Sequence, residues 1–221
     1  AVDGWPTLHG LELQVPGDFS AAAFPLVAAL LVPGSDILLT DVGVNPTRTG
    51  LLTLLQQMGA AIEVINPRLV SGEPLADLRV RYAPLTGIVV APELVPLAID
   101  ELPIFLTAAA VARGETLLTG AAELRVKESD RITAMATGLS RIGAVIEELP
   151  DGVRVTGSPS GVLAGGSVVD SYTDHRIAMS LLVAGLVSRQ PVTVQRCANI
   201  ATSFPDFVAA MAGLGARIEQ P

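Results

Sequence analysis

Apolar side chains fill three stretches of the chain on nearly every face, and these stretches predict three buried helices. Each stretch is rich in Ala and Leu and follows an aspartate: Asp18, Asp100 or Asp174. A helix that is apolar all round is typical of a domain interior, because none of its faces gains from contact with water. After each predicted helix comes a Gly or polar break and then a segment rich in β-forming residues.

Three further segments predict amphipathic helices. Each ends in a Gly-Ala pair, at Gly59, Gly143 and Gly215, and continues into a short apolar stretch with Ile and then Glu. Glycine often ends a helix because it adopts the left-handed conformation without strain. In the second segment one apolar stripe recurs at helical spacing; it is formed by Ile132, Met135, Ala136, Leu139 and Ile142.

The two sets of helices alternate, so the chain reads as three repeats of roughly 75–80 residues, at about 10–92, 93–166 and 167–221. Further strands are expected at 78–82, 87–90, 152–156 and 167–170. Units this small do not bury their own apolar faces. We therefore expect one α/β (α+β) domain, with the buried helices in its core. The third repeat stops at residues 218–221, so we expect its last strands to be missing or supplied by another segment of chain.

Composition disfavours several functions. The formal net charge is −8, whereas non-specific binding to nucleic acid needs a basic surface. The longest apolar runs, near 21–32 and 177–187, are too short and interrupted to span a membrane, and no signal-peptide pattern is visible. The single cysteine, Cys197, excludes an internal disulfide and a cysteine-based zinc site. We expect it to be half-buried, in a cytoplasmic protein.

The starts of the three buried helices indicate a candidate site. If a pseudo-threefold axis relates the repeats, the three N-termini lie at one end of the domain, where partial positive charge and unpaired N–H groups attract anions. Asp18, Asp100 and Asp174 are equally typical as N-caps, so both interpretations stay open. Motifs of nucleotide-binding loops, zinc proteases and serine hydrolases are absent from the sequence.

The densest run of charge precedes the second amphipathic helix and comprises Glu123, Arg125, Lys127, Glu128, Asp130 and Arg131. One interpretation is an exposed helical turn with ion pairs between residues four apart. The other is a clamp for phosphate or carboxylate, in which arginine binds bidentately and lysine acts as a point charge or proton donor. Lys127 is the only lysine among 14 basic residues. Its isolation fits either a preference for arginine codons or one site that needs an ammonium group.

Asp174, His175 and Arg176 stand in a row at the third helix start. Basic side chains at a helix N-terminus are unfavourable unless an anion lies there, so this triplet favours a ligand site. The other histidine, His9, is expected at the surface.

Two segments resemble the signatures of one enzyme family. Residues 124–144, LRVKESDRITAMATGLSRIGA, resemble the RVKE(S/T)DR signature of 5-enolpyruvylshikimate-3-phosphate synthases, and residues 172–186, YTDHRIAMSLLVAGL, resemble their DHR(I/M)AM signature. The segments VPGDFSAAAFPLVAALL, GVNPTRTGLL and ATSFPDF are also similar to that family. The resemblance runs from about residue 10 to residue 219.

The resemblance implies a fold and a reaction. These enzymes transfer the carboxyvinyl group of phosphoenolpyruvate to the 5-hydroxyl of shikimate 3-phosphate and release phosphate, without a metal or organic cofactor. Two lobes, each of three βαβαββ units, close over the substrates. The chain is then the C-terminal lobe. We expect it to need the N-terminal half as its partner, to be inactive alone, and to lack the N-terminal strand segment and the second lobe.

The family's site residues carry over where the motifs match. Lys127 matches the lysine that contacts both substrates, and Glu128 matches the acid implicated in proton transfer at the methylene carbon of phosphoenolpyruvate. Arg131 and Arg176 match the arginines that hold phosphoenolpyruvate, and His175 matches the histidine beside the latter.

Asp100 matches the aspartate near the attacking hydroxyl, which makes it a candidate base and, with Lys127, a contact of shikimate 3-phosphate. Two positions depart from the pattern. Glu123 stands where many members carry an Asn that contacts shikimate 3-phosphate, and Thr202 stands where many carry a Lys that helps to bind phosphoenolpyruvate. Both departures resemble a bacterial branch that tolerates glyphosate. The alternatives are a lobe of the sister enzyme that uses UDP-N-acetylglucosamine, and a non-catalytic scaffold domain.

Overall fold

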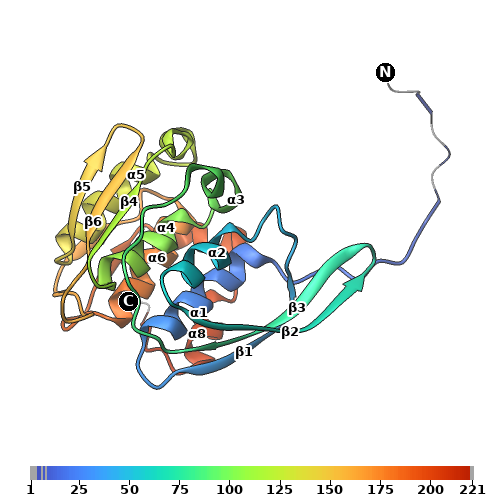
Figure 1. Cartoon of the computed structure of the whole chain (residues 1–221), viewed down its shortest axis with the longest axis horizontal. Coiled ribbons are helices and arrows are strands. Elements are labelled where there is room, and N and C mark those ends of the chain that lie inside the picture. The colour runs from blue at the N-terminus through green and yellow to red at the C-terminus, as the bar shows by residue number, and fades with distance from the viewer. Residues whose placement is uncertain (1–3, 6, 8, 220–221) are drawn as a thin grey trace.

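The computed structural model describes residues 4–5, 7 and 9–219, and a bundle of three apolar helices lies at its centre (Figure 1). These helices are α1 (Phe19–Leu31), α4 (Leu102–Val111) and α6 (His175–Leu186). Each contacts the other two, and every residue of α4 is buried. Burial of apolar surface drives this arrangement, at about 25 cal/mol per Å². The predicted core of buried helices is therefore confirmed.

Sheets and amphipathic helices enclose this core. The first sheet is antiparallel and has the order β1 (Asp36–Gly43), β3 (Glu73–Arg81), β2 (Ala61–Val70). The second is also antiparallel and has the order β4 (Glu115–Leu118), β6 (Gly152–Thr156), β5 (Val145–Leu149). The third is a parallel pair, β7 (Val168–Asp170) and β8 (Thr193–Gln195). Figure 1 shows the first two sheets on different sides of the helical core.

The remaining helices are short or amphipathic: α2 (Gly50–Gln57), α3 (Val95–Ala98), α5 (Arg131–Arg141), α7 (Ile200–Ser203) and α8 (Phe207–Gly213), with 3-10 turns at Pro92–Leu94, Ala122–Val126 and Cys197–Asn199. The whole apolar stripe predicted on α5 and just beyond it is buried, as its spacing required. Among the described residues, no single helix is long and apolar enough to cross a membrane. One pair, Pro92–Ala98 with Leu102–Val111, meets the criterion by length and composition, but it bends by 118°.

Backbone pairing makes the three repeats visible. In each repeat the segment before the buried helix pairs in parallel with the strand after it: Gly17 with Val42, Val89 with Leu117, and β7 with β8. In the first two repeats an antiparallel strand, β3 or β6, then joins on the other side. The described part of the third repeat contains no such strand, and a groove of about 1430 Å³ lies along β8 instead.

The amphipathic helices α2, α5 and α8 end alike. The N–H of each Gly donates to the carbonyl three residues earlier, and the N–H of the following Ala donates to the carbonyl five residues earlier. This double hydrogen bond requires a left-handed residue, and the φ angles of Gly59, Gly143 and Gly215 are 92°, 99° and 93°. The Gly-Ala pairs therefore end the helices as predicted.

The structure decides against the N-cap interpretation for Asp100 and against one predicted strand. Asp100 is not an N-cap: α4 begins at Leu102, preceded by Glu101, and Pro103 fixes its first turn. The segment 87–90 is not a regular strand, because the 3-10 turn at Pro92–Leu94 ends it after isolated bridges at Thr86 and Val89. Asp18 and Asp174 are N-caps, each accepting a hydrogen bond from the N–H two residues later.

Replacing Gly143 by Ala tests the shared helix ending. A side chain at φ 99° is strained, and its Cβ would lie 2.9 Å from the Cβ of Ala164, so Gly143→Ala should cost about 1–2 kcal/mol. Urea denaturation followed by circular dichroism should show a lower midpoint. Gly213→Ala is the matched control: the added Cβ has no atom within 4 Å, and Ala favours the helix, so the midpoint should hold or rise. Equal losses in both variants would refute this account.

Candidate active site

The starts of the three buried helices lie together, as the repeats predicted. Ser20 in the first turn of α1 donates a hydrogen bond from Oγ to Oε1 of Glu101, just before α4, at 2.5 Å. Arg176 in the first turn of α6 donates from Nη1 to the main-chain oxygen of Asp100 at 2.9 Å. The partial positive charges of three helix N-termini therefore meet in one place.

Four basic side chains surround the carboxylate of Asp100. Nζ of Lys127 lies 3.8 Å from Oδ1, and Nη1 of Arg131 lies 3.6 Å from the same oxygen. On the other oxygen, Nη1 of Arg48 lies at 3.6 Å and Nη2 of Arg176 at 3.8 Å. All four distances exceed a direct hydrogen bond, so the cations face the carboxylate without closing on it. Three of these four cations come from the predicted site.

Arg131 and Asp174 form a buried ion pair that fixes α5 against α6. Nε of Arg131 donates to Oδ2 of Asp174 at 2.8 Å, and the two side chains are 1% and 0% exposed. The helices approach closely at Gly138, where an added Cβ would lie 2.9 Å from a methyl group of Leu181. Burial by itself would raise the pKa of Asp174, but the hydrogen bond and charge of Arg131 outweigh it and lower that pKa below its ordinary value.

Arg131 also carries an unused donor. Its Nη2 donates to Oε2 of Glu128 at 2.6 Å, whereas buried Nη1 has no hydrogen-bond partner within the described part of the chain and faces Asp100. An unpaired buried N–H is costly, so this atom is a natural contact for an anion or water.

The charged segment before α5 does not form the regular helical turn that one interpretation of the sequence expected. Residues Ala122–Val126 form a 3-10 turn, and Lys127 is extended. Lys127 and Arg131 therefore do not share one helical face. Lys127 still pairs with Glu123 at 2.7 Å. The interpretation as an exposed turn is wrong for Arg131, which is buried.

Glu101, Ser20 and Arg48 complete the cluster, and the sequence interpretation missed all three. The side chain of Glu101 is 2% exposed. Burial raises the pKa of Glu101, while the Ser20 hydrogen bond and the charges of Arg176 and Arg48 oppose that rise. Arg48 lies within GVNPTRTGLL, one of the segments that are similar to the family. That similarity was the one signal in the sequence that pointed to Arg48.

The other candidate residues lie at the margin. His175 is half-buried; burial and then the charge of Arg176 lower its pKa, which favours a neutral ring at pH 7. Thr202 is exposed on α7, where its hydroxyl donates to the carbonyl of Asn199 at 2.7 Å. His9 is exposed and Cys197 is half-buried, as expected.

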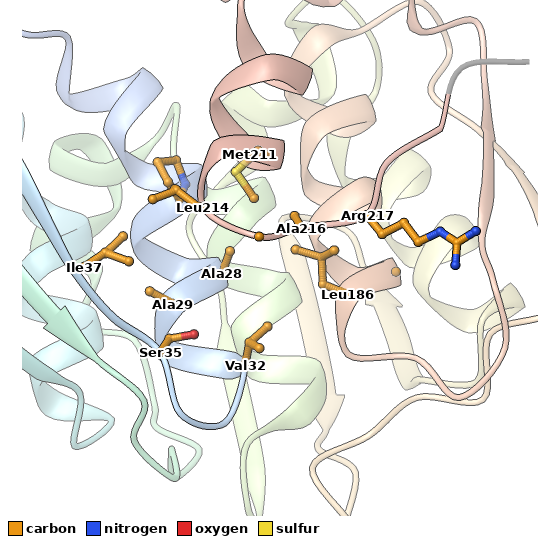
Figure 2. A pocket seen from close by; sticks show the side chains of 13 residues that line it. Ala28, Ala29, Val32, Ser35, Ile37, Leu186, Met211, Leu214, Ala216 and Arg217 are labelled. Carbon is orange, nitrogen blue, oxygen red and sulfur yellow. The ribbon is translucent and has the colours of Figure 1, made fainter.

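A pocket of about 370 Å³ lies at the opposite ends of α1 and α6 (Figure 2). Ala28, Ala29 and Val32 at the end of α1 and Leu186 at the end of α6 line it, together with Met211. The cavity is therefore separate from the charged cluster. Within the described residues, no group of three His, Cys, Asp or Glu side chains has the geometry to hold a metal ion.

The cluster holds the kinds of group that can bind an anion and exchange a proton. Arginines that carboxylates hold in place offer their remaining N–H groups to phosphate or carboxylate oxygens. Asp100 and Glu128 both face Arg131, and carboxyl groups can exchange protons. The arrangement is a candidate site for a small anion at converging helix N-termini.

Comparison with known proteins first gives the class of fold. The enolpyruvyl transferase NikO from Streptomyces tendae superposes with a TM-score of 0.66 at 19% identity, over 93% of this chain and 44% of that one. This likeness shows the enolpyruvyl transferase fold, with its repeats around buried helices.

The chain belongs to the EPSP synthase (3-phosphoshikimate 1-carboxyvinyltransferase) family, whose model matches residues 1–211. It is 63% identical over 218 residues to 3-phosphoshikimate 1-carboxyvinyltransferase of Magnetococcus marinus, covering 99% of this chain and 49% of that protein. The enzyme of that name from Halorhodospira halophila is 55% identical, covering 99% and 48%. The solved EPSP synthase of Acinetobacter baumannii is 46% identical with a TM-score of 0.91, covering 94% and 48%.

These relatives confirm the family that the two signatures indicated and do not favour the UDP-N-acetylglucosamine alternative. The chain spans about half the length of the curated relatives it matches.

Arg131→Met tests whether the buried pair organises the site. The variant leaves Asp174 buried without its partner, so unfolding free energy at pH 7 should fall by about 3–5 kcal/mol. Because the pKa of Asp174 is lowered in the folded chain, the pair's stabilisation is present above the unfolded pKa and is lost as pH falls through the folded value. The difference in unfolding free energy between wild type and variant should therefore become smaller below about pH 4.

Urea titrations at several pH values measure this gap. Arg79→Met is the control, because Arg79 is half-exposed in a surface pair with Asp36, and its denaturation midpoint should stay near that of wild type. A gap that widens in acid would refute the account.

Proposed function

We propose that the chain forms one lobe of an enzyme that transfers the carboxyvinyl group of phosphoenolpyruvate to the 5-hydroxyl of shikimate 3-phosphate, in the biosynthesis of aromatic amino acids. One observation carries this proposal: in a member of this family, four basic side chains face Asp100 where three helix N-termini meet. Such an arrangement suits a substrate with two anionic groups and a reaction that moves protons.

Phosphoenolpyruvate offers a carboxylate and a phosphate, and the cluster offers matching donors. Arg131 would bind through Nη1, its buried N–H group without a partner among the described residues. Arg176 would bind through the side of its guanidinium that faces Asp100, and Lys127 would add a mobile positive charge. His175, neutral beside Arg176, would donate or accept a hydrogen bond without adding repulsion between cations.

The proposed chemistry is an addition followed by an elimination. The 5-hydroxyl oxygen bonds to C2 of phosphoenolpyruvate while Asp100 accepts the hydroxyl proton and Glu128 gives a proton to C3. Glu128 then takes a proton back from C3, the C2–C3 double bond reforms as the C2–O bond to phosphate breaks, and the proton on Asp100 leaves with the phosphate. Asp100 can take the role of base because no basic side chain of the described residues lies at hydrogen-bond distance from its carboxylate, which leaves the oxygens open to the hydroxyl. The same cations stabilise charge on the phosphate that leaves.

Shikimate 3-phosphate would meet Asp100 through its 5-hydroxyl and Lys127 through a ring substituent. Glu123 pairs with Lys127 at 2.7 Å and is 64% exposed. The carboxylate of Glu123 would repel the phosphate of shikimate 3-phosphate. We therefore propose that Glu123, at the exposed rim of the site, orients Lys127. Thr202 is exposed and uncharged, so its hydroxyl would bind phosphoenolpyruvate less strongly than a lysine at this position. Glyphosate tolerance stays a prediction. A cytoplasmic location also stays a prediction.

The partner in this proposal is the N-terminal half of the same kind of enzyme. Two features support it: the chain covers about half of its relatives, and β8 borders a groove of about 1430 Å³ where the other repeats have a further strand. We further propose that residues 1–221 form a single lobe, with repeats at about 10–92, 93–166 and 167–221. The site is then open to the second lobe, and the chain alone is inactive.

Reconstitution tests this function. The chain is mixed with the N-terminal half of the Magnetococcus marinus relative, and phosphate release from both substrates is followed. Activity should appear only in the mixture, and Lys127→Ala should lower it by about 100-fold or more, because the variant removes a charge that contacts both substrates.

The matched control is Arg154→Ala, which removes a surface ion pair on the second sheet and should leave activity unchanged. Lack of turnover in a complex shown to form would count against the proposal. Turnover by the chain alone would contradict the division into two lobes.

A further inference from the structure

A buried carboxylate, that of Glu101, lies behind the arginines of the cluster and has no part in the chemistry proposed above. Its side chain is 2% exposed, whereas that of the preceding residue, Asp100, is 24% exposed. Two consecutive residues thus present one carboxylate toward the core and one toward the site. Removing a carboxylate from water is strongly unfavourable unless cations and hydrogen bonds compensate.

The compensation comes from three separate parts of the chain. Oε1 of Glu101 accepts a hydrogen bond from Ser20 on α1 at 2.5 Å and lies 3.4 Å from Nη1 of Arg176 on α6. Nη2 of Arg48, in the segment before α2, lies 3.9 Å from the same oxygen and donates to Oγ of Ser20 at 3.1 Å. Oε1 of Glu101 therefore attracts both Arg176 and Arg48 by charge, and it is also linked to Arg48 through the hydroxyl of Ser20.

These contacts divide the guanidinium of Arg176 into two sides. Nη1 donates to the main-chain oxygen of Asp100 and faces Glu101, so groups of the protein occupy it. Nη2 faces the carboxylate of Asp100 at 3.8 Å, on the side of the proposed substrate. An arginine held in this way loses little rotamer freedom when a ligand binds, which strengthens binding without a new contact.

We infer that Glu101 is a positioning residue for the phosphoenolpyruvate site, which holds Arg176 directly, and Arg48 through Ser20, in place before the substrate arrives. This inference rests on the proposed function, in which Arg176 binds phosphoenolpyruvate. Glu101 touches no substrate in this account. Its effect should therefore fall on the binding of one substrate and pass through Arg176.

Glu101→Gln in the two-lobe enzyme is the direct test, since it removes the charge and keeps the size of the side chain and an acceptor for Ser20. KM for phosphoenolpyruvate should rise about tenfold, as for loss of a charged hydrogen bond. KM for shikimate 3-phosphate should stay within about twofold, and kcat should change less than KM for phosphoenolpyruvate. Glu148→Gln is the control: it loses a comparable contact with Arg125 at 2.9 Å, away from the cluster, and should leave all three constants unchanged.

The variants in Arg176 decide whether the effect passes through that residue. The loss in Glu101→Gln/Arg176→Lys should be smaller than the product of the two single losses. Independent, multiplicative losses would overturn the inference, as would an unchanged KM for phosphoenolpyruvate or equal losses for both substrates.

A second readout does not depend on activity. In the ¹⁵N-labelled chain, the guanidinium signals of Arg176, assigned with Arg176→Lys, should show restricted rotation in the wild type and faster rotation in Glu101→Gln. Fast rotation already in the wild type, or no change in the variant, would overturn the inference. If the two-lobe enzyme is inactive while these signals behave as expected, the proposed function fails and the positioning role stands.

Discussion

Mutual burial of α1, α4 and α6 is the constraint on which the rest of the structure depends. Each of these helices is apolar on nearly every face, so none of them is stable against water, and each must be covered by the other two. Three repeats that contribute one such helix each, in the same direction, bring three N-termini to one end of the core. The location of the site is therefore a consequence of how the core is buried.

The charges of the cluster follow from this convergence. Helix N-termini attract negative groups, and Asp18 and Asp174 cap two of them while Asp100 and Glu101 precede the third. Two of these carboxylates, Asp174 and Glu101, in turn hold Arg131 and Arg176, which would otherwise be unfavourable near helix N-termini. Arg131 is the clearest case: it is 1% exposed and pairs with a fully buried aspartate. The result is a set of fixed cations with donors left for a ligand, which is the preorganisation that anion binding and charge stabilisation require.

Much of the fold and the family could be predicted from the sequence, because the strongest signals in the sequence are local or periodic. The apolar stretches predicted the buried helices, the Gly-Ala pairs predicted the ends of α2, α5 and α8, and the two signatures indicated the family. Glu101 was missed because its importance depends on Ser20 and Arg48, which lie 81 and 53 positions away in the chain. Spacing along one helix does not reveal contacts of that kind. The extended backbone at Lys127 was missed for a related reason: helical spacing between charges also occurs across a 3-10 turn followed by an extended residue.

The central claim is that the ring of cations around Asp100 is the substrate site of a two-lobe enzyme. A crystal structure of the chain, assembled with the N-terminal half of a relative and soaked with shikimate 3-phosphate and a non-reacting analogue of phosphoenolpyruvate, tests it most directly. The account predicts analogue oxygens on Nη1 of Arg131 and Nη2 of Arg176, with the 5-hydroxyl within hydrogen-bond reach of Asp100. Both ligands bound elsewhere, with Arg131 and Arg176 still paired only to protein carboxylates, would contradict it.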